Sequence, residues 1–403
     1  MFHHTSRTLT RAIPMSYNLF LVILLAMLSA FAPFVTDMYL PSLPSMEVYF
    51  HTTSSMVQLG LMSSMVGLAI GQIIFGPLSD KYGRRPVLLA AIWLFIISTV
   101  VCLVSPSILF FVAIRLLQGI GAAGGVVLSR SIATDYYEGA QLAKMLAIIG
   151  AINGVASVAA PVVGGLMTDW AGWQGIFVVI LCIGLALLAG CIRFRETLPT
   201  ELRSDRSFFH TFGSFLTIVR NRRYIFYTLQ LALVQGILFG NIASSPFIVQ
   251  HHYGFSALIF SFCFAINALV LGLGAAASVK FRTSELSTRV SSIAMCVISL
   301  VTLVTFIHGC NFWIYESLVT LMIFAMGLSF PSSTSLAMRS ERRHAGSASA
   351  LLGALCFVVG GLVSPLVGFG NMLLPTALVF VVCSFASLGC ALYAERQPVC
   401  DGE

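Results

Sequence analysis

Charged residues are scarce in this chain. Only 9% of its 403 residues are Asp, Glu, Lys or Arg, compared with about 25% in an ordinary soluble domain. Fifteen acidic and 22 basic side chains are too few to hydrate the surface of a folded chain of this length. The composition therefore excludes a soluble enzyme and a disordered protein. The mean hydropathy of +0.94 indicates that lipid is the main solvent.

The sequence also lacks the residue groups that hold metals, form disulfides or bind nucleotides. Nearly all ten cysteines lie in apolar runs, where Cys behaves as a small hydrophobic residue, so we expect no disulfide. The pairs His3–His4 and His251–His252 have no Cys or carboxylate partner at metal-binding spacing. No nucleotide-binding loop is present, and no cluster of His, Ser and acids resembles the site of a membrane-embedded enzyme. We expect a protein that is not an enzyme and has no metal or cofactor.

Long apolar runs, in contrast, are abundant. A bilayer-spanning helix needs about 20 mostly apolar residues. Twelve runs qualify: 17–38, 55–78, 87–105, 107–129, 144–168, 173–192, 224–247, 256–279, 290–308, 313–337, 346–369 and 372–394. The first run is too long for a signal-peptide core and has no cleavage site. The sequence therefore predicts an all-α integral membrane protein with twelve transmembrane helices.

The basic residues are segregated between the loops. With twelve crossings, all but one of the 22 Lys and Arg fall on one side of the membrane, and the exception, Arg115, lies inside a helix. Basic loops face the cytoplasm, so both termini are predicted to be cytoplasmic. The net charge of +7 thus reports orientation, and we expect no binding of nucleic acid.

The chain divides into two halves. The polar stretch 194–223 separates an amino-terminal six-helix half, 1–193, from a carboxy-terminal six-helix half, 224–403. Ala160–Gly164 in the fifth run matches Ser364–Gly368 in the eleventh, 204 residues later. Internal repeats are typical of transporters, whose substrate site lies near the midplane between the repeats. A channel is less favoured, because no filter-like sequence is present.

The loop between the second and third runs carries the most specific motif. It reads Gly-Pro-Leu-Ser-Asp-Lys-Tyr-Gly-Arg-Arg-Pro over 76–86. Asp80 can cap the next helix or pair with a cation, although a plain topology signal would also explain the loop. The stretch resembles the G-x-L-x-D-x-x-G-R-R/K signature of the major facilitator superfamily. The resemblance implies a cytoplasmic gate motif made of Gly76, Asp80, Gly83, Arg84 and Arg85.

Two further motifs lie in the fourth and fifth runs. Arg115 is costly in the hydrocarbon region, which favours a functional role. The stretch 115–121 resembles the R-x-x-Q-G motif of the superfamily, which implies proton coupling and includes Gln118, Gly119 and Gly121. The fifth run resembles the antiporter motif, with Ala160 where that motif has Gly. Plain helix packing also explains its small residues, which with the helix-bending proline are Gly154, Pro161, Gly164 and Gly165.

Two acidic residues lie within or at the ends of apolar runs. Asp37 ends the first run and either caps the next turn or is a protonatable carboxylate that works with Arg115, the only base within the membrane. A carboxylate that moves between an apolar site and a site near a cation gains and loses a proton. Glu316 is interpreted as a solvated acid at a helix start.

Several short stretches narrow the resemblance: 37–44, 245–250, 253–256, 327–331 and 346–353. Together they resemble the Bcr/CflA group of drug–proton antiporters over nearly the whole chain. The segment 280–289 has lost the Gly and Asp pattern, so the cytoplasmic latch is expected in the amino-terminal half. The resemblance implies alternating access around a central cavity. Its expected polar residues are Tyr39, Gln118, Asn153, Gln235, Asn241 and Asn267.

These features predict a monomeric exporter of small-molecule drugs in the inner membrane of a bacterium, driven by the proton gradient. Its partners would be the substrate, protons and the lipid bilayer. The alternative is a dedicated carrier of an endogenous metabolite or siderophore, because a fold does not specify a substrate.

Overall fold

The computed structural model describes residues 15–137, 139–200, 203, 218–341, 345–370 and 372–397. His3, His4 and most of the segment 194–223 lie outside these ranges. The described elements are all helical: α1 (Met15–Asp37), η1 (Leu40–Ser42), α2 (Leu43–Tyr49), α3 (Ser54–Tyr82), α4 (Arg84–Leu103), α5 (Ile108–Tyr136), α6 (Gly139–Arg193), α8 (Arg222–Phe247), η3 (Ile248–His252), α9 (Ala257–Ser278), α10 (Ser284–His308), α11 (Phe312–Arg339), α12 (Ala345–Val363), η5 (Ser364–Gly368) and α13 (Leu373–Glu395).

The helices confirm the twelve expected crossings. Among the described residues, eleven helical stretches are long and apolar enough to span a membrane. One of them, Lys144–Arg193, has 50 residues, which is far longer than one crossing requires. It breaks at Gly172, whose φ of 60° and ψ of −170° are not helical. The stretch is therefore two crossings joined by a tight turn, as the separate runs 144–168 and 173–192 predicted.

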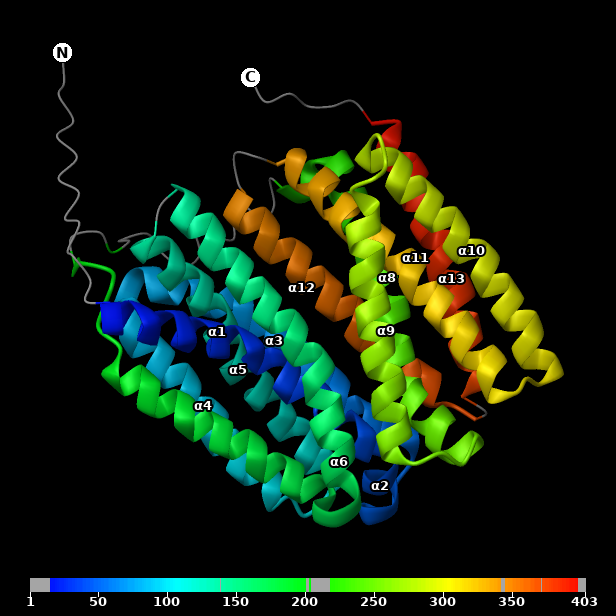
Figure 1. Cartoon of the computed structure of the whole chain (residues 1–403), viewed down its shortest axis with the longest axis horizontal. Helices are drawn as coiled ribbons and strands as arrows, with labels where there is room; N and C mark the ends of the chain where they lie inside the picture. The colour runs from blue at the N-terminus through cyan, green and yellow to red at the C-terminus, as the bar shows by residue number, and fades with distance from the viewer. Residues whose placement is uncertain are drawn as a thin grey trace.

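The helices form two bundles side by side (Figure 1). Helices α1 to α6 pack mainly with one another, and so do α8 to α13. Contact between the bundles is made chiefly by α6 with α9 and by α12 with α3. The repeated motifs around Pro161 in α6 and Pro365 in η5 therefore both lie in helices of this interface.

The two bundles repeat one close helix contact. In α3 and α5, a Cβ on Gly67 or Gly119 would collide with the backbone of the facing helix. In α9 and α11, a Cβ on Gly274 or Gly327 would do the same. The corresponding glycines are separated by 207 and 208 residues, close to the offset of the sequence repeat. Small residues bring these membrane helices into backbone contact.

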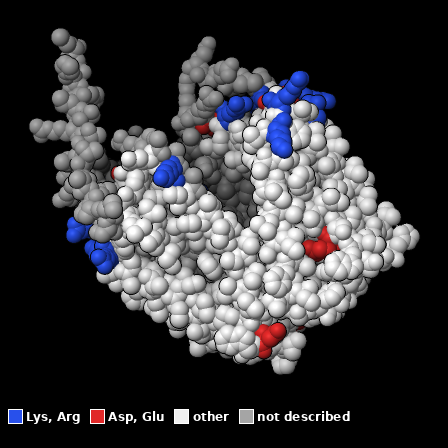
Figure 2. Space-filling model, viewed as in Figure 1, with Lys and Arg blue, Asp and Glu red and all other residues white. Residues whose placement is uncertain are grey.

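Apolar side chains lie on the outside of the helices and polar side chains lie inside, as a lipid environment requires. Many large apolar side chains are exposed on the outside of the helices, whereas Arg115, Gln118, Gln58 and Gln230 are fully buried. Lys and Arg gather at one end of the molecule (Figure 2). We call this end the basic face, and the other end the opposite face.

Candidate functional site

A cavity of about 880 Å³ lies between the two bundles. Asp80 and Arg130, near the basic-face ends of α3 and α5, line its mouth. Asp37, the last residue of α1, lines it toward the opposite face. The hollow opens toward the basic face (Figure 2). The structure is therefore a one-sided state, open at the basic face.

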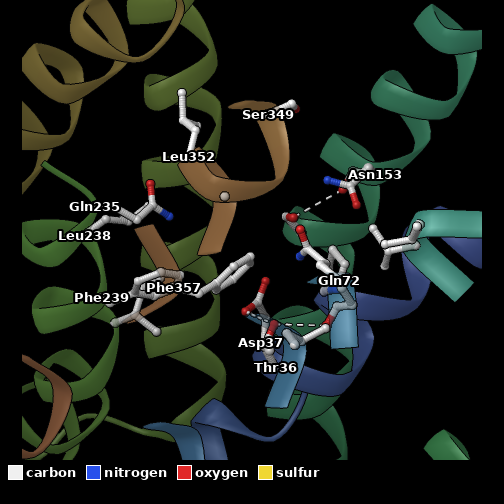
Figure 3. Close-up of a pocket in the computed structure, with 18 of the residues that line it drawn as sticks. Thr36, Asp37, Gln72, Asn153, Gln235, Leu238, Phe239, Ser349, Leu352 and Phe357 are labelled. Carbon is white, nitrogen blue, oxygen red and sulfur yellow. Dashed lines mark hydrogen bonds between the residues drawn. The ribbon is translucent and has the colours of Figure 1, made fainter. Parts of the chain in front are cut away.

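Both bundles contribute polar and apolar side chains to the wall (Figure 3). Asp37, Gln72 and Asn153 come from the amino-terminal bundle, and Gln235 and Phe357 face them from the other. Further aromatic and amide residues of the wall are Phe239, Phe264, Asn241 and Asn267. Such a mixture can hold an amphipathic molecule by apolar contact and orient it by a few hydrogen bonds.

Asp37 is a carboxylate without a cationic partner. Its Oδ1 accepts a hydrogen bond of 2.8 Å from Thr36 Oγ1, and no ion pair among the described residues includes it. The following helices, η1 and α2, have no side-chain cap. Asp37 therefore does not cap the next turn, which was one of its two interpretations.

Arg115 lies behind the cavity wall and is fully buried. Its Nη1 donates to Gln118 Oε1 at 2.5 Å, and its Nη2 donates to Val35 O at 3.1 Å and Ser64 Oγ at 3.0 Å. The guanidinium also stacks on Tyr39, 4.4 Å from the ring centre. Because Val35 is in the last turn of α1, its carbonyl has no intrahelical partner and lies at the negative end of the helix dipole.

The structure does not join Asp37 and Arg115 in an ion pair. Their connection is the final turn of α1, where Arg115 binds the Val35 carbonyl two residues before Asp37. A change in that turn is therefore expected to act on both residues. Their predicted role in proton coupling remains a prediction.

Four of the six expected cavity residues line the cavity: Asn153, Gln235, Asn241 and Asn267. The other two, Tyr39 and Gln118, are fully buried against Arg115 and do not line the cavity in this state. Gln118 Nε2 donates to Thr99 Oγ1 at 2.7 Å. Sequence reasoning missed Gln72 on α3, although an amide within an apolar run was a usable signal.

Glu316 is not a solvated acid at a helix start, contrary to the sequence interpretation. Helix α11 is capped by Asn311, which accepts from the Ile314 amide at 3.0 Å, and its first turn has no acid. The carboxylate of Glu316 instead accepts a hydrogen bond of 2.7 Å from Asn267 Nδ2. The approach of α9 to α11 produces this contact, which the local sequence around Glu316 did not reveal.

The 76–86 motif forms a charged cluster at the basic face. Gly83 has a φ of 100°, a conformation that a side chain would strain. Arg84 pairs with Asp80 at 2.5 Å and with Asp135 of α5 at 2.9 Å. Of the two expected roles of Asp80, the structure therefore shows the ion pair.

Another residue caps α4. Glu196, just beyond α6, accepts the backbone N–H groups of Arg84 at 2.9 Å and Arg85 at 3.0 Å. A carboxylate at a helix amino terminus is stabilised by the free N–H groups and the helix dipole. Sequence reasoning missed Glu196 and Asp135, because each acts on a loop far away in the chain.

The glycines of the α5 and α6 motifs differ in their contacts. A Cβ on Gly119 or Gly121 would meet the backbone of α3 or α4, and one on Gly164 or Gly165 would meet Met38 O or Ser261 of α9. A Cβ on Gly154 would meet nothing within 4 Å. Pro161 lies inside α6, and the bend expected at it stays a prediction; the non-helical φ and ψ of this helix are at Gly172.

At the opposite face, polar contacts join the two bundles. Gln250 Nε2 donates to Pro41 O at 2.9 Å, and Gln58 Nε2 donates to Ala243 O at 3.0 Å. At the basic face, all four ion pairs among the described residues stay within one bundle. Bonds across the two bundles thus close the opposite face while the basic face is open.

Known proteins resemble this chain in sequence and in fold. The profile of the Major Facilitator Superfamily matches residues 19–365. An uncharacterized MFS-type transporter, YdgK of Bacillus subtilis, is 38% identical, with 92% of this chain and 94% of that protein covered. A bicyclomycin resistance protein homolog of Haemophilus influenzae is 28% identical, with 90% and 92% covered.

A solved structure agrees on the fold. The crystal structure of a D-xylose-proton symporter superposes with a TM-score of 0.73 at 16% identity, covering 96% of this chain and 99% of that one. At this identity the likeness concerns the fold alone. The match to the family profile and the cavity between two six-helix bundles lead to one conclusion: the chain belongs to the major facilitator superfamily and is a membrane transporter, not an enzyme.

Proposed function

We propose that the protein is a proton-coupled exporter of small amphipathic molecules, of the Bcr/CflA type. It acts as a monomer in the inner membrane of a bacterium, with its basic face and both termini in the cytoplasm. One observation carries the proposal: Asp37, a carboxylate without a cation, lines a cavity that is open on one side only. An ionisable group at such a place is expensive and is expected to serve the transport cycle.

Asp37 is suited to exchange a proton for substrate. The described charged residues of the cavity wall are Asp37, Asp80 and Arg130. Asp80 is already paired with Arg84, and Arg130 lies at the mouth, so Asp37 is the free charge deep in the cavity. When the cavity opens to the opposite face, the carboxylate takes a proton from water. When it opens to the cytoplasm, substrate binding releases that proton to the cytoplasmic water.

The cavity wall supports an amphipathic substrate. Phe239, Phe264 and Phe357 offer apolar surface, and the amides beside them offer donors and acceptors. The relative named for bicyclomycin resistance makes drug export the first candidate. A dedicated metabolite carrier is the second candidate, since both ends of the Asn267 amide are fixed by hydrogen bonds, a preorganised arrangement that favours one ligand.

Asp37→Asn tests the proposal, because it keeps the size and polarity of the side chain but removes the titratable group. We expect substrate-driven proton movement in everted vesicles to be lost while the protein still inserts into the membrane. Asp169→Asn, a change at an exposed acid of α6, is the matched control and should transport normally. Full proton movement in Asp37→Asn would disprove the role of this residue.

A resistance screen separates the two candidate substrates. A deletion strain and an overexpressing strain are compared for growth on unrelated antibiotics and dyes and for secreted compounds. Resistance to several unrelated drugs supports the drug exporter. Loss of one secreted compound, with no change in resistance, supports the metabolite carrier.

A further inference from the structure

Glu316 is an unusual acid in the carboxy-terminal bundle. The other described acids of this bundle, Glu285, Glu341 and Glu395, lie at the basic-face ends of their helices. Glu316 is the fifth residue of α11, which starts at the opposite face, and it is partly buried. A carboxyl group within a membrane-spanning helix costs free energy, so its position favours a functional role over a packing role.

The carboxylate has a neutral partner that is itself held firmly. Asn267 Nδ2 donates to Glu316 Oε1 at 2.7 Å, and Thr320 Oγ1 donates to Asn267 Oδ1 at 2.9 Å. Glu316 and Thr320 are one helical turn apart, so a single face of α11 fixes both ends of the amide. No ion pair among the described residues includes Glu316.

Among the described residues, the surrounding helices bring no cation into an ion pair with this carboxylate. The titratable groups around it are Cys263 on α9, Tyr315 on α11, and Tyr253, whose hydroxyl contacts Cys310. Helix α12 has no charged residue, and the charges of α8 and α10 lie at their basic-face ends. His308 ends α10 and is exposed. The carboxylate is therefore free to bind a proton without breaking an ion pair.

Asn267 connects this carboxylate to the substrate cavity. The amide lines the cavity and is 8% exposed. Glu316 is thus one hydrogen bond away from the space that Asp37 lines from the other bundle. If the position served only to orient Asn267, a glutamine would accept the same hydrogen bond without placing a charge in the membrane. The carboxylate adds only the capacity to bind a proton.

We propose that Glu316 is a second proton-binding site of the transport cycle, and that Asn267 transmits its state to the cavity. This inference rests on the proposed proton coupling. An O–H bond forms on the carboxylate with a proton taken from water on the opposite side. The neutral group is a weaker acceptor for Asn267 Nδ2–H, so the amide is freed toward the cavity. The O–H bond breaks when the proton leaves to cytoplasmic water.

Infrared difference spectroscopy of the full-length protein in lipid vesicles tests the proposal without a substrate. The pH is changed between about 5 and 9, where a perturbed carboxyl group titrates. We expect the carbonyl band of a protonated carboxyl group that disappears in Glu316→Gln and remains in Asp37→Asn. Asn267→Leu should shift the frequency and the midpoint of this band, and Asp169→Asn should leave it unchanged. A Glu316 that stays ionised over the whole range, as a fixed acceptor for Asn267 would, produces no such band.

The spectra separate this proposal from the proposed function. A Glu316→Gln spectrum that superimposes on the wild-type spectrum over the whole range overturns the second site. If the Asp37 band is present and the Glu316 band is absent, only the second site fails. If the Glu316 band is present but Asp37→Asn retains full antiport, the second site stands and the assignment of Asp37 fails.

Discussion

A buried guanidinium needs more acceptors than one neighbour can provide. Arg115 uses an amide oxygen, a hydroxyl and a main-chain carbonyl, and its Nε has no partner. No carboxylate in the described part of the chain pairs with it, so its charge is stabilised by hydrogen bonds, the end of a helix dipole and the faces of Tyr39 and Phe177. Such a group holds the last turn of α1 in place beside Asp37.

Arg115→Lys keeps the charge but loses the planar fork that reaches several acceptors together. We expect efflux to fall about tenfold or more, because each hydrogen bond of a charged group is worth about 1.5–3 kcal/mol. The measurement is the initial rate of efflux at equal membrane abundance. Tyr39→Phe is the control, since it keeps the ring under the guanidinium. Wild-type rates in Arg115→Lys would show that a point charge suffices.

The sequence predicted which residues were unusual, but not their partners. Arg115 and Asp37 were conspicuous because charges are costly in apolar runs. Their contacts depend on Val35 and Ser64, which lie 80 and 51 residues from Arg115. The same limit applies to Glu316, whose partner Asn267 belongs to another helix. Partners set by helix packing leave no trace in the local sequence.

At the scale of helices, prediction was more complete. Hydrophobicity and length give the crossings directly, because lipid demands about 20 apolar residues for each. The irregular ends were not predicted: η3 is a single π-helical segment after α8, and η5 is a 3₁₀ turn after α12 that begins next to Pro365. Such endings depend on contacts beyond the helix itself.

Gly274→Ala tests the close contact of α9 and α11. The added Cβ would meet Phe324 O and lie 3.0 Å from Gly327 Cα, so the helices must separate. We expect a loss of stability of about 1–3 kcal/mol, as for other overpacked sites. The readout is the thermal unfolding temperature in detergent.

Gly272→Ala is the matched control on the same helix. A Cβ there meets nothing within 4 Å, and alanine favours the helix. The control should unfold at or slightly above the wild-type temperature. Equal losses in both variants would contradict the role assigned to close backbone contact.

At the scale of the whole molecule, hydrogen bonds between the two bundles decide which face of the cavity is open. Gln58→Leu and Gln250→Leu together remove two hydrogen bonds at the opposite face, each worth about 1 kcal/mol. The loss of about 2 kcal/mol in total should shift the equilibrium between the two states roughly 30-fold toward the state open at that face, since 1.4 kcal/mol corresponds to about tenfold.

The measurement is the labelling of Asn241→Cys by an impermeant maleimide from the opposite face, with the native cysteines replaced by serine. Gln230→Leu is the control, because its amide bonds Ser329 and Ser387 within one bundle. Faster labelling only in the double variant supports the conclusion that these two hydrogen bonds close the opposite face. Equal labelling in all variants would assign the closure to packing alone.

The turn at Gly172 has a practical consequence for mapping topology. A single residue joins two crossings there. An inserted epitope tag would therefore push them apart and disturb the contact between Gly165 of α6 and Ser261 of α9. The connection 104–107 between α4 and α5 is longer, since α4 ends at Leu103 and α5 begins at Ile108, and Val104 within it is 72% exposed. An antibody or glycosylation reporter for the first half therefore belongs at 104–107.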